Sequence, residues 1–364
     1  MIRAVQDMAN AVATSLGLPL VTSATVIGID YDCAAKVTLL MFGDDGKARF
    51  VAKLARRAES ERALVAEYNA LVKLWSAGPR TVSAELPRPL ALEDVAGRRV
   101  LLSTAVSGTP LTVGYYAPGH VRRPKRVAQD FALAGTWLYR FQRATRSGTT
   151  TIGPAAFNEW IRPTMARYRA EIGWTSWESR LFSERLPALC GALSGTDVPV
   201  VAVHGDYAPG NVLVSNGQVS GVIDWELGRS AGLPFSDLFK FAVSYSSYLD
   251  RASPSGYGTP AGHPGWALAR DRWGAIPGWT NGTGVLYALF GSGWFPDLVR
   301  SFLHLHLRRL AISPVAARLF LPVFLAEQAL VLEDPAYRGG YRALLRLLYE
   351  QGEARLPRLD EVVA

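Results

Sequence analysis

The pattern of apolar and polar positions predicts a compact α+β unit in the first hundred residues. Residues 1–20 and 58–77 carry apolar side chains at helical spacing. The pairs Asp45-Gly46 and Ala96-Gly97 supply the turn chemistry of tight hairpins. Five short runs have strand character, at residues 24–29, 36–42, 48–54, 90–94 and 100–105. The pattern therefore predicts a sheet with two helices.

Beyond a break at Gly108-Thr109-Pro110 the pattern becomes mainly helical. One helix is predicted over residues 124–143, and one or two more are predicted over residues 157–193. Residues 253–284 are rich in Gly and Pro and hold several Trp residues, which predicts an insertion that acts as a lid or is partly helical. The second part of the chain should therefore be a larger helical domain.

Composition and charge narrow the class of protein. The chain has 364 residues, of which 49% are hydrophobic and 19% charged, as in soluble globular proteins. Its net charge of +8 suits a polyphosphate ligand, but no nucleic-acid-binding motif accompanies it. Two distant cysteines form no disulfide framework, which favours the cytoplasm. The longest apolar run, residues 319–332, is interrupted by Glu327 and Gln328, so no membrane span is expected.

Polar residues gather around one predicted hairpin, in which the turn pair Asn216-Gly217 joins apolar runs at residues 212–214 and 219–223. Asp206 and Asn211 follow an apolar run at residues 199–203, and Asp224 stands where the strand at 219–223 ends. Taken singly, such residues more often cap loops and turns. Together, two carboxylates and an amide suit a magnesium-phosphate site, since oxygen ligands hold the metal and a free carboxylate can orient a hydroxyl.

The sequence motifs of this stretch also resemble those of a known family. The segments HGDYAPGNVL and GVIDWE resemble the H-R-D-x-x-x-x-N and D-F-G elements of protein kinases. Gly205 replaces the arginine, and Trp225-Glu226 replace Phe-Gly, as in the aminoglycoside phosphotransferase and choline kinase group. The resemblance implies an α+β, bilobal, protein-kinase-like fold. A β-rich nucleotide-binding lobe would span residues 1–106, and a mainly helical catalytic and acceptor-binding lobe would span residues 107–364.

The resemblance assigns roles to the residues of this stretch. Asp206 would be the catalytic residue that orients the acceptor hydroxyl, while Asn211 and Asp224 would hold Mg²⁺. His204 would brace the loop. Asp237 matches the acidic residue that bonds to the catalytic loop, although a helix N-cap fits it equally well. Glu226 would belong to the metal shell or, alternatively, be structural.

The first hundred residues would supply the rest of a nucleotide site. Lys53, in Val-Ala-Lys, matches the strand lysine that pairs with the nucleotide phosphates. Glu67 would be its helix partner, with Glu61 as the rival. Backbone groups of Ser103 and Ala105 would bind the adenine edge.

One element departs from the kinase pattern. Kinases cover the phosphates with a glycine-rich loop, whereas the corresponding residues 24–36 hold only Gly28 and include the acidic Asp30 and Asp32. The sequence thus predicts Mg²⁺-assisted transfer of phosphate from ATP, with GTP as the alternative, to a hydroxyl of a small molecule. The acceptor would be an antibiotic such as an aminoglycoside, as in resistance enzymes. A metabolic sugar or amino-alcohol kinase is the first alternative, and a nucleotide-binding module without turnover is the second.

Overall fold

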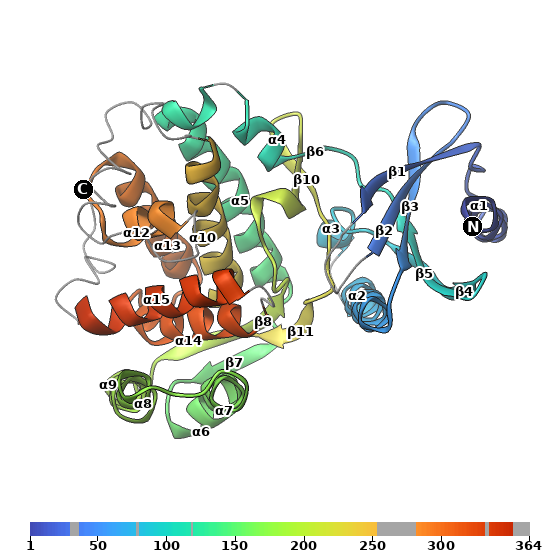
Figure 1. Cartoon of the computed structure of the whole chain (residues 1–364). Helices are drawn as coiled ribbons and strands as arrows, with labels where there is room; N and C mark the ends of the chain where they lie inside the picture. The colour runs from blue at the N-terminus through green and yellow to red at the C-terminus, as the bar shows by residue number, and fades with distance from the viewer. Residues whose placement is uncertain (30–35, 78–79, 118, 253–281, 332–334, 352–364) are drawn as a thin grey trace. The chain divides into compact units, whose positions relative to one another are not determined.

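The computed structural model describes the chain except residues 30–35, 78–79, 118, 253–281, 332–334 and 352–364 (Figure 1). The chain divides into two compact units. The first contains Met1–Leu111, His204–Asp206 and Gly210–Ser230. The second contains Thr112–Val203, Tyr207–Pro209 and Ala231–Ala364. The predicted hairpin with Asp224 therefore clusters with the N-terminal residues.

A five-stranded antiparallel sheet forms the centre of the first unit, with the order β1-β2-β3-β5-β4. Every strand predicted for this region is present within two residues of its expected ends. The turn between the last two strands holds Ala96 at φ 50° and Gly97 at φ 76°, the positive dihedrals that a two-residue hairpin needs. The strands are β1 (Ser23–Ile29), β2 (Lys36–Phe42), β3 (Ala48–Ala55), β4 (Pro89–Val95) and β5 (Arg98–Thr104).

The two helices α1 (Ile2–Ser15) and α2 (Ala58–Ala77) cover opposite faces of this sheet. Alternation along β3 turns Phe50 and Ala52 into the core under α1. Lys53 therefore lies on the face that α2 covers. The predicted helix at residues 1–20 is too long, because the chain leaves the helix before Gly17, which adopts φ 63°.

The predicted hairpin also forms in the first unit. Strands β9 (Val212–Ser215) and β10 (Gln218–Val222) pair antiparallel around Asn216 at φ 50° and Gly217 at φ 72°. β6 (Thr109–Pro110) adds a third strand on the other side of β9. This register brings Asn211, just before β9, and Asp224, just after β10, to the same end of the hairpin.

Helices make up most of the second unit. An aromatic cluster of Phe131, Phe241, Tyr245 and Phe302 fills the space between α5, α10 and α13. Gly135 on α5 allows the close approach, since a Cβ there would lie 2.9 Å from the ring of Phe302. The long helices are α5 (Pro124–Ala144), α10 (Phe235–Ala252), α12 (Gly282–Phe290), α13 (Trp294–Arg309), α14 (Ala316–Val331) and α15 (Pro335–Gln351).

The segment predicted as one or two helices over residues 157–193 is more interrupted than expected. Pro163 and Pro187 lack the N–H that would continue the helical hydrogen-bond ladder. Each is the second residue of a helix that follows a π-helical turn. The pieces are the π turns Phe157–Ile161 and Leu181–Arg185 and the helices α6 (Pro154–Ala156), α7 (Arg162–Glu171), α8 (Ser176–Arg180) and α9 (Leu186–Ala192).

The remaining elements are short. The sequence did not predict β7 (Gly148–Thr151), whose polar residues pair with β8 (Asp197–Val203). The others are α3 (Arg80–Ser83), α4 (Leu111–Tyr115), β11 (Arg229–Gly232) and the 3₁₀ turns His120–Arg122 and Pro209–Asn211. Most of the predicted insertion, residues 253–281, lies outside the described residues. None of the described helices has the length and apolar character needed to cross a membrane.

Candidate active site

A buried ion pair joins the sheet of the first unit to α2. The Lys53 ammonium donates to both carboxylate oxygens of Glu67, at 2.6 and 2.7 Å. Glu67 is only 2% exposed, whereas the rival Glu61 lies on the exposed side of α2. The two residues meet because Lys53 occupies the α2-facing side of β3. The structure thus selects Glu67 as the partner of Lys53.

The same lysine reaches the hairpin. Lys53 Nζ lies 2.8 Å from Asp224 Oδ1, so one ammonium bridges a helix carboxylate and a hairpin carboxylate. Asp224 adopts φ 70°, a region that non-glycine residues rarely enter and that often marks functional sites. Trp225, fully buried, anchors the turn by donating its indole N–H to the Val222 carbonyl at 2.9 Å. The strained conformation of Asp224 is therefore held in place by its neighbours.

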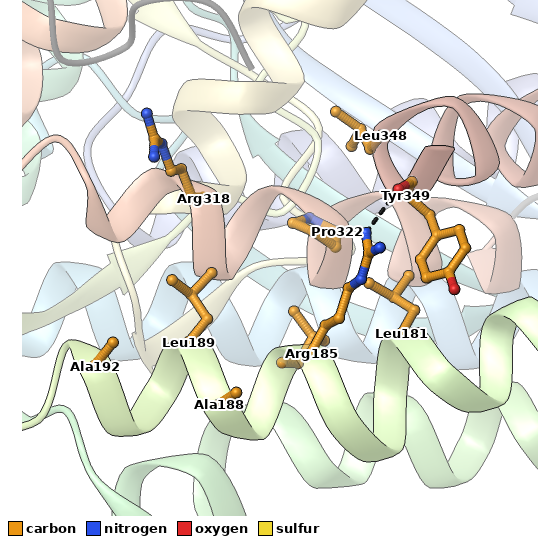
Figure 2. Close-up of a pocket in the computed structure, with 10 residues that line it drawn as sticks. Leu181, Arg185, Ala188, Leu189, Ala192, Arg318, Pro322, Leu348 and Tyr349 are labelled. Atoms are coloured by element: carbon orange, nitrogen blue, oxygen red, sulfur yellow. Dashed lines mark hydrogen bonds between the residues drawn. The ribbon is translucent and has the colours of Figure 1, made fainter. Parts of the chain in front are cut away.

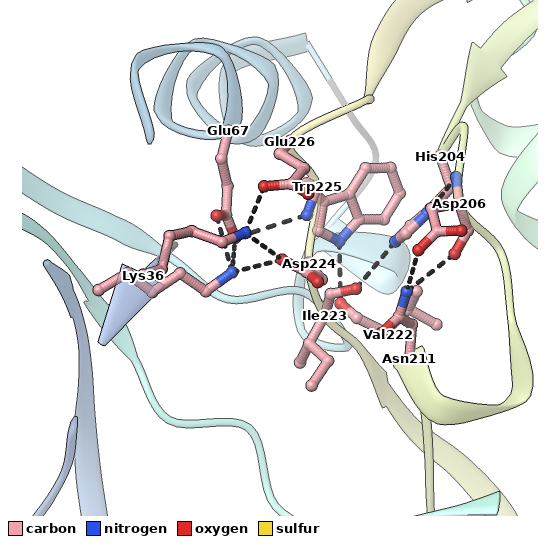
Figure 3. Close-up of polar contacts among 11 residues, drawn as sticks. Lys36, Glu67, His204, Asp206, Asn211, Val222, Ile223, Asp224, Trp225 and Glu226 are labelled. Carbon is pink, nitrogen blue, oxygen red and sulfur yellow. Dashed lines mark hydrogen bonds and ion pairs between the residues drawn. The ribbon is translucent and has the colours of Figure 1, made fainter. Parts of the chain in front are cut away.

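A second lysine, which the sequence reasoning missed, joins this cluster. Lys36 is 6% exposed, forms an ion pair with Glu226, and lies 3.6 Å from Asp224 Oδ1 (Figure 3). Thr38 stands opposite Lys53 in the β2–β3 ladder, and Lys36 shares the face of Thr38. This register could have been inferred from the Asp45-Gly46 hairpin. The partner Glu226, however, lies 190 residues away in the sequence, so no local pattern indicates the pair.

The charges in this cluster stabilise one another. Burial by itself would lower the pKa of Lys53, but the carboxylates of Glu67 and Asp224 outweigh burial and raise it. Burial would raise the pKa of Asp224, but the ammonium groups of Lys53 and Lys36 hold it well below its usual range. Burial and the charge of Asp224 raise the pKa of Glu226. Lys53 and Asp224 are therefore both charged at neutral pH.

The loop before the hairpin is held by His204. Its imidazole Nδ1 accepts from the Asp206 backbone N–H at 3.1 Å, and its Nε2–H donates to the Ile223 carbonyl at 2.9 Å. Gly205 adopts φ 84°, and a Cβ there would lie 2.5 Å from the Leu227 carbonyl oxygen. A side chain at this position would therefore be strained and would clash, which explains the glycine.

The amide of Asn211 is oriented by Asp206. Its Nδ2 donates to the Asp206 carbonyl at 2.9 Å and to Asp206 Oδ2 at 3.0 Å. Both donors point at Asp206, so the oxygen Oδ1 is the atom that Asn211 can offer to a cation. The carboxylate of Asp224 supplies the second hard oxygen ligand.

This donor set fits Mg²⁺ carried by a nucleotide. Among the described residues, no group of three or more His, Cys, Asp or Glu side chains is arranged to hold a metal ion. Mg²⁺ typically takes only one or two carboxylates from a protein and completes its shell with phosphate and water. Asp224 and Asn211 offer one carboxylate and one amide oxygen, which is a donor set of this kind.

The structure places the other predicted residues as follows. Ser103, in β5, pairs with Val51 and Pro89 in the sheet. The Ala105 N–H already donates to the Arg49 carbonyl at 2.8 Å, so an adenine contact of Ala105 would use its carbonyl oxygen. Asp237 belongs to the second unit, where it is fully buried in the first turn of α10.

The second unit contains a cavity of about 600 Å³ that holds none of the predicted site residues (Figure 2). Arg185 borders it, donates to the Tyr349 carbonyl at 2.7 Å, and stacks 4.1 Å from the Tyr349 ring. Its lining is mainly aliphatic and comes from the π turn before α9 and from α9, α14 and α15: Leu181, Leu186, Ala188, Leu189, Ala192, Pro322 and Leu348, with Arg185, Arg318 and Tyr349. The described residues of its lining include no carboxylate, unlike the cluster around Asp224.

The fold and this cluster define a kinase-like phosphotransferase. The sequence model of the phosphotransferase enzyme family matches residues 40–272, more than half of the chain. The chain belongs to this family and has its protein-kinase-like fold. It is therefore an enzyme of the phosphotransferase class, and the predicted fold class and family are confirmed.

Solved structures similar to the chain come from antibiotic phosphotransferases. A thermostable mutant of aminoglycoside phosphotransferase APH(4)-Ia, in a ternary complex with AMP-PNP and hygromycin B, is 12% identical over 95% of this chain and 98% of its own, with a TM-score of 0.49. The streptomycin-ATP complex of APH(2")-IIa is 14% identical over 94% and 97%, with a TM-score of 0.48.

A macrolide 2'-phosphotransferase, MphH from Brachybacterium faecium, is 17% identical over 93% of this chain and 97% of its own, with a TM-score of 0.41. No curated protein matches the chain. The family assignment rests on the match over residues 40–272. The similarity to these structures does not identify the acceptor of this chain.

Proposed function

We propose that the chain is an ATP-dependent, Mg²⁺-assisted O-phosphotransferase that phosphorylates a hydroxyl of a small molecule. The observation that supports this most is the bridge from Glu67 through Lys53 to Asp224, with Asn211 and Asp206 joined to each other beside the same hairpin. Phosphoryl transfer needs mainly charge neutralisation and alignment, and this cluster offers both.

Each residue has a distinct task in this proposal. Lys53, held by Glu67, binds the α- and β-phosphates, while Asp224 and Asn211 hold Mg²⁺. When bound, Mg²⁺ neutralises charge on the phosphates. Asp206 orients the acceptor hydroxyl and receives its proton, and its distance from Asn211 is fixed by the 3.0 Å hydrogen bond.

Supporting residues complete the proposal. His204 keeps the loop in place through its bonds to the Asp206 and Ile223 backbones. Asp237, buried at the start of α10, would position the catalytic loop. The strand end at Ser103 and Ala105 would receive the adenine of ATP, with GTP as the alternative nucleotide. The division into a nucleotide lobe at residues 1–106 and an acceptor lobe at 107–364, and the cytoplasmic location, stay predictions.

The acceptor that we propose is an antibiotic such as an aminoglycoside or another sugar-bearing compound. A cationic aminoglycoside favours an acidic pocket, yet the chain carries a net charge of +8. For this reason a neutral sugar is a second candidate acceptor, and the amino alcohol of a metabolic kinase, which is also a cation, is a third. The experiment below separates these acceptors without assuming one of them.

A nucleotide-consumption screen tests the proposal. ADP release is measured with Mg·ATP and, separately, Mg·GTP against aminoglycosides, macrolides, other antibiotics, sugars and choline-like amines. We expect turnover with one acceptor class. Asp206→Ala should then lower the rate by about a thousandfold or more and leave ATP binding nearly unchanged, because it removes a contact made to the reacting hydroxyl.

Two results would contradict the proposal. If Asp206→Ala retained the wild-type rate, Asp206 would not be the catalytic residue. If the wild-type protein bound Mg·ATP tightly but consumed none with any acceptor, the chain would be a nucleotide-binding module without turnover, as its glycine-poor loop sequence allows.

A further inference from the structure

We propose that Lys36 is a second phosphate-binding residue of the nucleotide site, in addition to Lys53. This inference rests on the proposed function. Residues 24–36 hold a single glycine, Gly28, so this stretch is poor in the residue that lets backbone amides approach phosphates closely. A buried ammonium at the start of β2 supplies positive charge at the point in the chain where kinases use that loop.

The register of the sheet places Lys36 beside Lys53. Lys36 and Thr38 project from the same face of β2, and Thr38 is paired with Lys53 on β3. Both ammonium groups reach the same atom, Asp224 Oδ1, at 2.8 Å from Lys53 and 3.6 Å from Lys36. A carboxylate suited to holding the nucleotide's metal is thus approached by two lysines.

The hydrogen-bonding capacity of Lys36 leaves room for a phosphate. An ammonium group has three N–H donors. Among the described residues, its ion-pair partners are Glu226 and, at 3.6 Å, Asp224. Glu226 accepts one of these donors, and Asp224 at 3.6 Å lies beyond hydrogen-bond distance. A further donor can therefore point to a phosphate oxygen while Glu226 keeps the side chain in place.

The charge balance of the cluster also favours this role. Lys36, Lys53, Glu67, Asp224 and Glu226 together carry a net charge of −1 when all are ionised. Without Lys36 the same cluster would carry −2, and it would repel a polyphosphate more strongly. A buried ion pair gains little stability over an apolar pair of the same size, so a role of this pair in binding a ligand agrees with its burial.

The alternative is that Lys36 serves only to hold the Glu226 side chain in place through their ion pair. A double variant separates the two roles, because Lys36→Met combined with Glu226→Gln removes the ammonium without leaving a buried unpaired carboxylate. Comparison with Glu226→Gln alone isolates Lys36, and Lys36→Arg restores the positive charge. Isothermal titration calorimetry measures the binding of Mg·AMP-PNP and of AMP to each protein, and thermal unfolding confirms that each is folded.

We expect the double variant to bind Mg·AMP-PNP about tenfold or more weakly than Glu226→Gln, a difference of about 1.4 kcal/mol. Its affinity for AMP should stay within about twofold, because AMP lacks the β- and γ-phosphates. Lys36→Arg should keep most of the triphosphate affinity.

Equal Mg·AMP-PNP affinity in the double variant and in Glu226→Gln would overturn the inference and leave the proposed function standing. Parallel losses for AMP and AMP-PNP would also overturn it, since they would indicate a general structural effect. A wild-type protein that bound neither nucleotide would refute the proposed function itself, and the role of Lys36 with it.

Discussion

Glu178 of the second unit is buried at the centre of a hydrogen-bond network that joins α7, α8 and α15. The Tyr168 hydroxyl donates to it at 2.7 Å, and the Arg342 guanidinium donates to both oxygens at 2.9 and 2.7 Å. The N–H and hydroxyl of Thr175 complete the set, at 2.8 and 2.6 Å, as the capping box of α8. The Glu178→Gln substitution would keep the shape and remove the charge.

The size of the effect follows from the pKa of Glu178. Burial would raise this pKa, but the hydrogen bonds from Arg342 and Thr175 outweigh burial and lower it from 4.5 to about 2. At 1.36 kcal/mol for each pH unit, the bound donors stabilise the ionised folded protein by about 3 kcal/mol. The glutamine side chain would also place its NH₂ group against N–H and O–H donors that now bind a carboxylate oxygen. Glu178→Gln should therefore lower the free energy of unfolding at pH 7 by about 3 kcal/mol.

The pH dependence has a defined sign. The folded-state pKa is lowered, so the stabilisation is fully present above the unfolded pKa near 4.5 and is lost as the pH falls through about 2. Urea unfolding of wild type and Glu178→Gln at several pH values between 7 and 2 should therefore show a gap that narrows below pH 4.5.

The matched control is Glu171→Gln. Glu171 pairs with Arg167 on an exposed face, and its removal should leave the free energy of unfolding nearly unchanged at every pH. A gap between Glu178→Gln and wild type that stayed constant from pH 7 to 2, or was absent at pH 7, would refute this account of the network.

Two further predictions concern the candidate active site. Lys53→Met should abolish tight Mg·ATP binding in calorimetry and lower the free energy of unfolding by about 3–5 kcal/mol, because Glu67 would be left buried and unpaired. Lys53→Met with Glu67→Leu should regain stability but not nucleotide binding; recovery of both would contradict the role of Lys53. Gly205→Ala should lower the thermal midpoint more than Gly217→Ala, because both positions have positive φ but only Gly205 faces a clash, with the Leu227 carbonyl. Equal decreases of the thermal midpoint in the two variants would contradict this prediction, because they would show that the clash with Leu227 does not lower stability.

The sequence by itself determined the elements that carry the chemistry. Strands and tight turns are local, so alternation and the pairs Asp45-Gly46 and Asn216-Gly217 predicted the hairpins that the structure contains. The spacing of Asp206, Asn211 and Asp224 relative to the hairpin also predicted that these residues would gather at one end of it. Both kinds of inference need only short-range geometry.

The tertiary structure decided which distant charges meet. Glu61 and Glu67 are both acidic residues of one helix, and only the packing of α2 on the sheet buries Glu67 against Lys53. Lys36 and Glu226 lie 190 residues apart, and their pairing depends on how the hairpin packs against β2 and β3. A carboxylate or an ammonium is not assigned a partner by its neighbours in sequence, because Coulomb attraction acts through space and only the folded chain sets the distances.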